Sequence, residues 1–363
     1  MHSSIRRSLS AILLATAGAM TAGAQATDST TPRRRIQPLP AVASSPETGL
    51  QFGATVLAVF EPAAMTRTRA SSIVASAVRS TKSQTRLVIE GERWTTGNAR
   101  RLYGQLAWQE FPLPYYGSGA NTPESAKEIY EPRGVELQLS AQQRVRGPLY
   151  AFVGTRLLSQ RMRFDTAGTL QFRTVTGTAA GRVVELNGGA LIDTREHLFA
   201  PRAGTYAQLT YTHSAAALGS EYRFQRVKLD ARRYQSVAGN HVLATQLLAI
   251  GTGGAAPFDQ LALVGGSDIL RGYTRGRYRD RALAAAQLEY RSPIKHRIGA
   301  VAFGGAGTVA ESLGDIGGST LFTTYGAGVR VQIDPRQRTA VRADYGRGRD
   351  GASGLYIGFN QAF

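Results

Sequence analysis

The segment LVGGSDILRGYTRGRYRDR, residues 263–281, is rich in arginine, a side chain that forms strong hydrogen bonds and ion pairs. It places five arginines in the eleven residues from Arg271 to Arg281, inside a long connection between alternating segments. A guanidinium group presents N–H donors in a planar fork, which matches the geometry of a carboxylate. We therefore expect this segment to form ion pairs with acids elsewhere in the chain.

Glu289 is the acid that the sequence offers to Arg271. It lies in AAAQLEYR, where side chains alternate between two faces as they do in a strand. The apolar positions of this stretch share one face and are Ala284, Ala286, Leu288 and Tyr290. Glu289 therefore falls on the polar face, and a charge-assisted pair with Arg271 would contribute about 1.5–3 kcal/mol.

Candidates for catalysis are few. No hydroxyl or carboxylate lies at motif spacing from a base, and GGSDIL lacks the strand-to-helix context of a phosphate-binding loop. The five histidines show no metal-ligand spacing; they are His2, His197, His213, His241 and His296. We expect no catalytic residue, no metal site and no cofactor, and a hydrolase built on a barrel is the enzymatic alternative.

Alternating apolar and polar segments dominate the chain from Ile36 onward. In RGVELQLSAQQRV, Val135 and Leu137 share one face while Glu136 and Gln138 share the other, and a period of two predicts strands. Sixteen strands are expected, with fourteen as the alternative, near 36–44, 49–60, 70–80, 84–95, 99–110, 132–145, 148–164, 178–194, 203–214, 220–236, 240–252, 281–291, 296–310, 322–333, 338–348 and 354–363.

The connections between these segments alternate in length. The long ones are separated by even numbers of strands and so lie on one side; they are 111–131, 165–177, 253–280 and 311–321. Long loops on one side and short periplasmic turns on the other are typical of outer-membrane barrels. Since lipid leaves no partner for free backbone groups, the strands must close on themselves. The predicted fold is an all-β transmembrane antiparallel β-barrel with a long loop folded into the lumen.

Charge supports this arrangement. The formal net charge is +18 and the chain has no cysteine. An arginine on the lipid face would cost about 2–4 kcal/mol near the midplane. The strand arginines on polar faces should therefore line a positive lumen; they are Arg223, Arg232, Arg291 and Arg342.

The chain begins like an exported protein. Basic Arg6 and Arg7, an apolar run and the small residues at 22–24 predict a signal peptide at 1–24. A short polar linker at 25–35 and an outer-membrane barrel at 36–363 follow. Export makes nucleic acid an unexpected partner.

The last residues, LYIGFNQAF, resemble the signal by which outer-membrane proteins are passed to the barrel assembly machinery. Tyr356, Gly358 and Phe363 match that signal, whereas Gln361 stands where an apolar residue is usual. The barrel assembly machinery is accordingly the expected partner for insertion of this chain.

Several motifs together resemble the BamA/TamA-type assembly barrels, also called bacterial surface antigens. LVGGSDILRGY and the following Glu-containing strand resemble their sixth extracellular loop, and VRADYGRGRDGASGLYIGFNQAF resembles their closing hairpin. SPETGLQFGA resembles a short subgroup without periplasmic repeat domains. The stretch DTREHLFAPRAGTY resembles their periplasmic turn, with Glu196 for the usual Asp and with matches at Asp193, Thr194, Arg195, Pro201 and Gly204.

The resemblance implies roles for the loop residues. Arg271 would pair with acids of the inner wall, Gly272 would allow a close approach, and Tyr273 would pack against the wall. AVAFGGAG stands where the family has F-x-D-x-G, and its acid is replaced by Gly305. Asp344, on the polar face of its strand, is a possible substitute.

The resemblance also implies insertion or translocation of proteins at the outer membrane, at a seam between the first and last strands that can open. Pro38 and Pro40 would weaken one side of it, and Gly354 and Gly358 the other. Only about eleven residues separate Gln25 from Ile36, which is too few for a periplasmic domain. The expected partners are outer-membrane lipids and unfolded outer-membrane or surface proteins. A passive, anion-favouring transport pore and a structural or surface-binding barrel are the alternatives.

Overall fold

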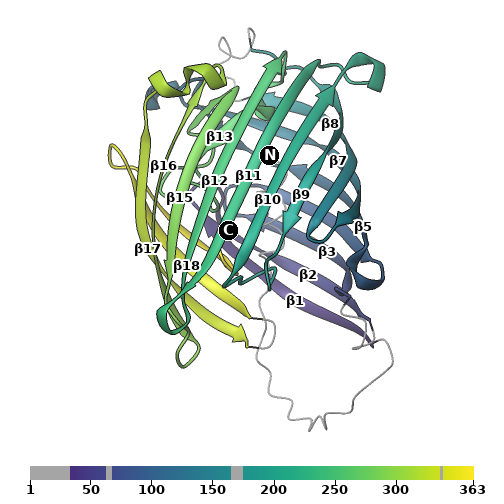
Figure 1. The fold of residues 1–363 in the computed structure, drawn as a ribbon. Coiled ribbons are helices and arrows are strands. Elements are labelled where there is room, and N and C mark those ends of the chain that lie inside the picture. The colour runs from purple at the N-terminus through teal and green to yellow at the C-terminus, as the bar shows by residue number, and fades with distance from the viewer. Residues whose placement is uncertain (1–32, 63–67, 165–174, 336–337) are drawn as a thin grey trace.

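The wall of the molecule is a closed antiparallel barrel of sixteen strands (Figure 1). The computed structural model describes residues 33–62, 68–164, 175–335 and 338–363. The predicted signal peptide lies outside these ranges. The wall strands are β1 (Arg33–Ser45), β2 (Gly49–Glu61), β3 (Ser71–Ser80), β4 (Thr85–Trp94), β5 (Arg100–Glu110), β7 (Glu128–Arg146), β8 (Leu149–Phe164), β9 (Gly181–Asp193), β10 (Gly204–Ser214), β11 (Phe224–Val237), β12 (His241–Gly254), β15 (Ala282–Arg291), β16 (Ile298–Ala310), β17 (Phe322–Asp334), β18 (Thr339–Gly348) and β19 (Ser353–Phe359).

Three further strands lie in the connections: β6 (Leu113–Tyr115) pairs with β7, and β13 (Ala262–Val264) pairs with β14 (Tyr278–Asp280). The described ranges also contain six 3₁₀ turns: η2 (Thr96–Asn98), η3 (Glu124–Ala126), η4 (Ala216–Leu218), η5 (Ala238–Asn240), η6 (Phe258–Gln260) and η7 (Leu313–Gly318). Within the described ranges, no helix is long and apolar enough to cross a membrane.

Side chains alternate along each wall strand as the sequence predicts. In β7, Val135 and Leu139 are 44% and 48% exposed on the outside, while Glu136 and Gln138 are buried inside. This inside-out pattern suits a wall with lipid outside, because apolar side chains then face hydrocarbon and polar ones face the lumen. The predicted strand type and facing are confirmed.

The connections divide by length between the two ends of the barrel. Figure 1 shows long connections, such as the one with η7, at the upper end and tight turns, such as the one with η5, at the lower end. In outer-membrane barrels the short turns face the periplasm. The lower end in Figure 1 is thus the periplasmic end.

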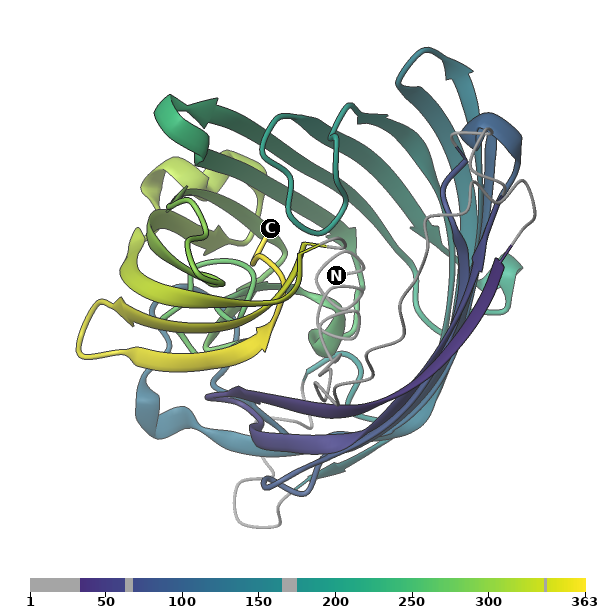
Figure 2. The same ribbon diagram turned by 90° about the horizontal axis from the view of Figure 1, so that it is seen from below.

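The end of the last strand differs from the prediction. A strand over 354–363 was expected, but β19 ends at Phe359 and both Phe359 and Phe363 are buried. Asn360 adopts a positive φ of 59°, which turns the chain. The C-terminus consequently lies inside the ring of strands (Figure 2).

Contacts with inward cations explain this turn. Arg291 Nη2 donates to the Phe363 carbonyl oxygen at 2.7 Å, and Arg330 Nε donates to Gln361 Oε1 at 2.8 Å. A local strand pattern contains no information on such contacts, because both arginines come from other wall strands.

Two smaller corrections concern boundaries. The wall begins at Arg33, so β1 includes three residues that the sequence assigned to the linker. Arg223 precedes β11 and is exposed, whereas it was expected to line the lumen. The other three arginines expected there, Arg232, Arg291 and Arg342, are buried inside the barrel.

Candidate functional site

The connection of residues 255–281 between β12 and β15, the lumen loop, packs against the inner wall. Its Ile269, Leu270 and Tyr273 form an apolar cluster with inward side chains such as Leu283 of β15 and Phe322 of β17. Burial of these side chains stabilises the loop on the wall by about 1.5–3 kcal/mol for each large apolar group.

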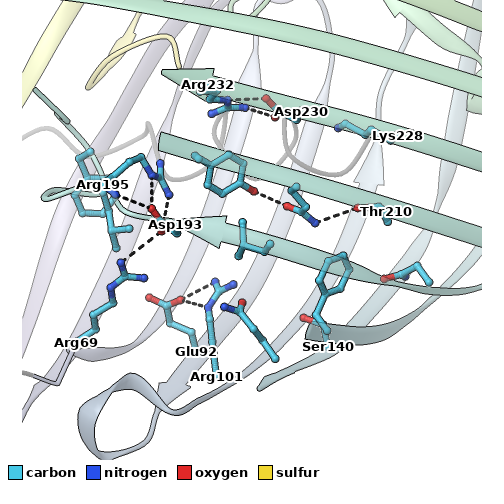
Figure 3. Close-up of a pocket in the computed structure, with 18 of the residues that line it drawn as sticks. Arg69, Glu92, Arg101, Ser140, Asp193, Arg195, Thr210, Lys228, Asp230 and Arg232 are labelled. Atoms are coloured by element: carbon cyan, nitrogen blue, oxygen red, sulfur yellow. Dashed lines mark hydrogen bonds and ion pairs between the residues drawn. The ribbon is translucent and has the colours of Figure 1, made fainter. Parts of the chain in front are cut away.

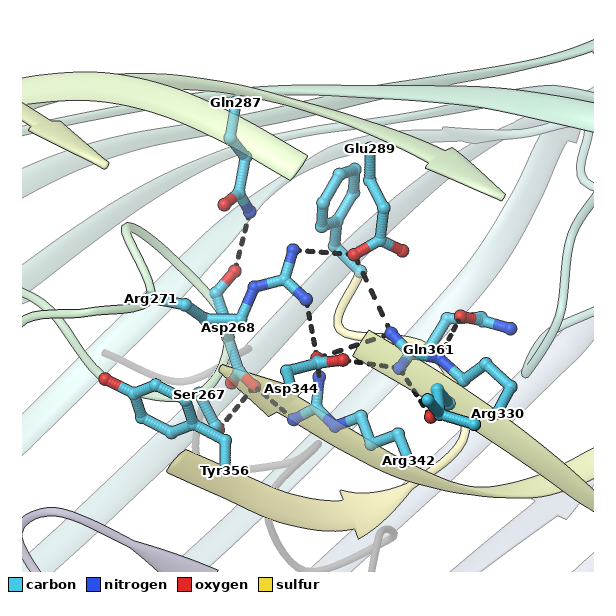
Figure 4. Close-up of polar contacts among 12 residues, drawn as sticks. Ser267, Asp268, Arg271, Gln287, Glu289, Arg330, Arg342, Asp344, Tyr356 and Gln361 are labelled. Carbon is cyan, nitrogen blue, oxygen red and sulfur yellow. Dashed lines mark hydrogen bonds and ion pairs between the residues drawn. The ribbon is translucent and has the colours of Figure 1, made fainter. Parts of the chain in front are cut away.

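Arg271 lies at the centre of the contacts between the lumen loop and the wall (Figure 4). Its Nη2 is 2.6 Å from Glu289 Oε2 and its Nη1 is 2.6 Å from Asp344 Oδ2. All three side chains are fully buried. The guanidinium carbon lies 3.6 Å from the ring centroid of Phe303, in the stretch that corresponds to F-x-D-x-G. The structure thus brings Arg271, Glu289 and Asp344 together.

Three more arginines share these acids. Arg291 Nε donates to Glu289 Oε1 at 2.8 Å, Arg330 donates to Asp344, and Arg342 Nη1 lies 3.8 Å from Asp344 Oδ2. Arg342 Nη2 also lies 3.7 Å from Asp268 of the lumen loop. The sequence analysis missed Arg330, although its position between outward Val329 and Val331 aims it inward. The absence of an acid at Gly305 is thus compensated by Asp344, with Arg330 as its second cation.

The cost of breaking this network is large. Removing one member of a buried ion pair leaves an uncompensated charge and destabilises a protein by about 3–5 kcal/mol. The acids and arginines lie away from water, so screening by salt is weak. The network therefore attaches the loop firmly to β15, β17 and β18.

Glycines allow the loop to approach the wall this closely. Gly272 has a φ of +122°, and a Cβ there would lie 2.7 Å from the backbone carbon of Arg347. In β18, a Cβ at Gly348 would lie 2.4 Å from the ring of Tyr273. The side chains of Arg271 and Tyr273 reach their partners only because these positions carry no Cβ.

Tyr356 is the second residue that holds the loop backbone. Its hydroxyl accepts from Gly272 N and donates to the Tyr273 carbonyl oxygen, both at 3.0 Å. Tyr273 in turn donates its hydroxyl to the Thr323 carbonyl oxygen at 2.9 Å. Tyr356 was singled out only as part of the C-terminal signal, and strand alternation alone could have placed it inward.

The lumen loop is also bonded to the opposite wall. Gln260 Oε1 accepts from Arg156 Nη1 of β8 at 2.9 Å, and its carbonyl accepts from Arg226 Nη2 of β11 at 2.6 Å. Asp259 Oδ2 accepts from Gln160 Nε2 at 2.7 Å, and burial raises the pKa of Asp259. The loop therefore crosses the lumen from one wall to the other.

The predicted periplasmic turn joins β9 to β10. Asp193 Oδ1 lies 2.9 Å from Arg195 Nε, and its Oδ2 lies 3.4 Å from Arg69 Nη2. Since Arg69 precedes β3, with β4, β5, β7 and β8 between it and β9, this ion pair reaches across the mouth of the barrel (Figure 3).

The remaining members of the turn motif fix its backbone. Thr194 Oγ1 accepts from Thr205 N at 2.8 Å, and a Cβ at Gly204, which has a φ of +106°, would lie 2.4 Å from the Thr194 carbonyl oxygen. The Pro201 carbonyl oxygen accepts from Arg291 Nη1 at 3.4 Å. Despite partial burial, N–H groups of Arg202 and Ala203 hold the pKa of Glu196 below its usual range. The turn is thus tied to the same arginine as the lumen loop network.

A cavity of about 310 Å³ opens inside the wall above this turn. Figure 3 shows its polar lining, with Arg195 and Arg232 on one side and Arg69, Glu92 and Arg101 on the other. Its lining includes Phe359 and Gln361, which leave the wall at the end of β19. The periplasmic half of the lumen is hence a polar space that reaches the last residues of the barrel.

The seam between the first and last strands is weak. In the described chain, β1 and β19 share one register pair, Ser44 with Ile357, whereas β1 pairs with β2 along its whole length. Alternate residues of a strand direct their backbone N–H groups to opposite neighbouring strands, and Pro38 and Pro40 have no N–H. The complete β1–β2 ladder must therefore use the N–H groups of the alternate set, such as that of Leu39. Both prolines therefore face the β19 side of β1.

In an antiparallel ladder without a bulge, the residue numbers of every pair have the same sum, which is 401 for Ser44 and Ile357. Continuing this register would place Gln361 opposite Pro40 and Phe363 opposite Pro38. These are the residues that turn into the lumen. The seam thus lacks the backbone N–H donors of Pro38 and Pro40 on the β1 side. On the other side it lacks strand residues opposite them, because β19 ends at Phe359.

The described residues contain no group of three His, Cys, Asp or Glu side chains that could hold a metal ion. Glu289 and Asp344 are instead paired with arginines.

Comparison with known proteins gives one family and several similar folds. A profile of the Omp85 superfamily domain matches residues 69–363. Among solved structures, BamA from Haemophilus ducreyi lacking POTRA domains 1–3 has a TM-score of 0.59 at 15% identity, covering 92% of this chain and 70% of that one. No curated protein matches the chain.

Two CdiB structures are also similar. CdiB from Acinetobacter baumannii has a TM-score of 0.59 at 12% identity over 91% of this chain. CdiB from Escherichia coli has a TM-score of 0.61 at 11% identity over 88% of this chain. The chain spans 65% and 62% of these two proteins, which is less than two thirds of each. At these identities the likeness shows the fold alone.

Proposed function

The chain belongs to the Omp85 superfamily of outer-membrane barrels, a family involved in protein insertion and translocation, and on this premise we propose that it inserts or translocates other proteins at the outer membrane. Barrels of this superfamily interact with membrane lipids and client proteins and are generally not enzymes. The proposed clients are unfolded outer-membrane or surface proteins.

The single register pair between β1 and β19 carries this proposal. A wall strand with free N–H and C=O groups is a template on which another strand can add. Opening here would break few hydrogen bonds, while every other strand pair of the wall keeps a long ladder. A client strand would pair with β1 or β19 at this position.

The lumen loop supports an assembly role over the alternative of an anion-favouring pore. It is bonded to β8 and β11 on one side and to β15 and β18 on the other, so a solute would have to displace it. In this proposal Arg271, Gly272, Tyr273, Glu289 and Asp344 keep the loop in the lumen while the seam opens. The C-terminal signal of Tyr356, Gly358 and Phe363 remains a prediction about the insertion of this chain.

The test is quantitative proteomics of the outer membrane and the cell surface in three strains: the parent, a deletion strain and an Arg271→Ala strain. We expect the same small set of barrel or surface proteins to fall in both mutants, which would identify the clients. An unchanged proteome in the deletion strain would contradict the proposal and favour the pore, which conductance of the purified barrel in a planar bilayer would then test.

A further inference from the structure

Arg275 belongs to the lumen loop, and among the described residues it has no ion-pair partner. In the same loop, Arg277 pairs with Glu124 at 2.8 Å, and Arg279 donates to the Pro114 carbonyl oxygen at 3.1 Å. Arg275 is half-buried and forms no ion pair within 4.0 Å with any described residue. It lines a cavity between the lumen loop and the wall.

This cavity, of about 180 Å³, lies on the extracellular side of the Arg271 network. The loop supplies Arg275, β4 supplies Arg86, and β18 supplies Arg342. Neutral polar side chains such as Ser80 and Gln84 fill part of the lining between them. Three guanidinium groups from three separate elements thus face one enclosed space.

Several of their donors have no acceptor. The Nε of Arg86, and both Nε and Nη1 of Arg342, are buried without a hydrogen-bond partner among the described residues. Arg86 also lacks an ion pair within the described chain; the charged groups that act on it are Glu136, Arg275 and Glu90. Buried donors normally have partners, because an unpaired one costs about 1–3 kcal/mol.

The acids that face the cavity do not satisfy these donors. Glu136 accepts from Arg156 Nη2 at 2.8 Å, and Asp259 accepts from Gln160 and Gln260. Burial raises the pKa of Asp259 and of Glu47, so both carboxyls hold their protons to higher pH than free acids. With Arg79 and Arg156 also in the lining, cations outnumber acids by five to three.

We propose that this cavity binds a small oxyanion, a phosphate or a carboxylate, between Arg275 of the lumen loop and Arg86 and Arg342 of the wall. An oxyanion supplies several acceptors in one small group and accepts paired N–H donors from guanidinium groups. It would also offset the repulsion between the like charges of Arg86 and Arg275, which act on each other across the cavity.

The site is next to the seam. Ser44 and Ile357, the residues that pair β1 with β19, line the same cavity. A bound oxyanion would therefore lie in the same cavity as the residues that join the two ends of the wall. Binding itself is a property of the closed barrel and does not depend on a role of the seam in assembly.

The test is calorimetric titration of the purified full-length barrel, in detergent free of lipopolysaccharide, with inorganic phosphate and separately with acetate. Ionic strength is held constant with chloride. We expect saturable binding of about one anion per chain, weakened at least about tenfold by Arg275→Gln and by Arg86→Gln, since each removes a charge-assisted contact. Arg281→Gln, which removes an exposed arginine from the same loop, should bind like the wild type.

Folding of each variant is checked by its heat-dependent mobility on a denaturing gel, and two independent variants keep the test valid if one fails to fold. A lipid source is distinguished by repeating the titration in nanodiscs with and without lipopolysaccharide. Loss of phosphate binding in the nanodiscs that contain lipopolysaccharide, but not in those without it, assigns the site to a lipid phosphate that already occupies it. The absence of saturable binding in detergent and in both nanodiscs, or equal weakening by Arg281→Gln, would overturn the proposal.

Discussion

Ser44 of β1 faces Ile357 of β19, and in the described part of the chain this one pair joins the two ends of the wall. By contrast, β1 and β2 are paired from Arg33 with Glu61 to Ser45 with Gly49. Antiparallel ladders gain stability from each successive hydrogen bond and cross-strand contact. The free energy needed to separate β1 from β19 is accordingly a small part of the stability of the barrel.

A disulfide across the seam should abolish client assembly. The chain has no cysteine, so Ser44→Cys with Ile357→Cys introduces one pair without background. Directly opposed residues have Cα atoms about 4.5–5.5 Å apart, which suits a disulfide. We expect a cross-link on a non-reducing gel, loss of the proteins that fall in the deletion strain, and recovery on reduction.

The matched control places the same chemistry in a continuous ladder. Val329 of β17 faces Ala343 of β18, so Val329→Cys with Ala343→Cys should cross-link without loss of client proteins. Wild-type levels of these proteins with a fully oxidised seam would show that the seam does not open during function.

Replacing both Pro38 and Pro40 with alanine should tighten the seam. The change restores two N–H donors on the side of β1 that faces β19. Each hydrogen bond that they form when residues 360–363 extend β19 along β1 is worth about 0.5–1.5 kcal/mol. We expect slower hydrogen–deuterium exchange in residues 353–363. Pro293→Ala, in the turn between β15 and β16, is the control, and equal exchange in all three proteins would argue against donor loss as the cause of the weak seam.

Arg271→Ala should destabilise the folded barrel by about 3–5 kcal/mol, because it leaves Glu289 and Asp344 buried with one cation fewer. Glu289→Gln should act in the same direction. The measurements are the urea midpoint and the temperature at which the compact gel form is lost. Arg281→Ala, at an exposed loop position, should stay within about 0.5 kcal/mol of the wild type, and a similar result for Arg271→Ala would refute the role of the network.

Asp259→Asn should stabilise the barrel increasingly as pH rises. Burial raises the pKa of Asp259 in the folded state above the unfolded value of about 3.9. Its stabilising contribution is complete below that unfolded value and is lost as pH rises through the folded pKa, while the asparagine does not titrate. The difference between the urea midpoints of variant and wild type should therefore grow from low pH until the folded pKa is passed.

Asp350→Asn removes one negative charge from an exposed turn and controls for net charge. A constant difference between Asp259→Asn and the wild type at every pH would mean that Asp259 has no role in the pH dependence of stability.

Strand type and facing could be predicted from sequence because both are local. Glu136 and Gln138 face inward and Val135 and Leu139 outward as soon as β7 forms, whatever the rest of the barrel does. The prediction failed for the end of β19, since the burial of Phe359 and Phe363 depends on Arg291 and on the interior rather than on β19 itself. It also missed Gly348 and Tyr356 as residues that hold the lumen loop, since no local pattern relates them to Tyr273.

The sequence by itself determined the barrel architecture, the division between long loops and short turns, and the lumen-facing position of Glu289, because an alternation of period two acts within each strand. It left the strand number at sixteen, with fourteen as the alternative. Only the tertiary structure decided that Arg271 meets Asp344, which is 73 residues away. Asp344 thereby supplies the second acid for Arg271 that is absent at position 305, where the chain has Gly305. The physical reason is register. The offset between neighbouring strands sets which inward side chains share a level of the lumen, and it follows from the closure of the whole wall.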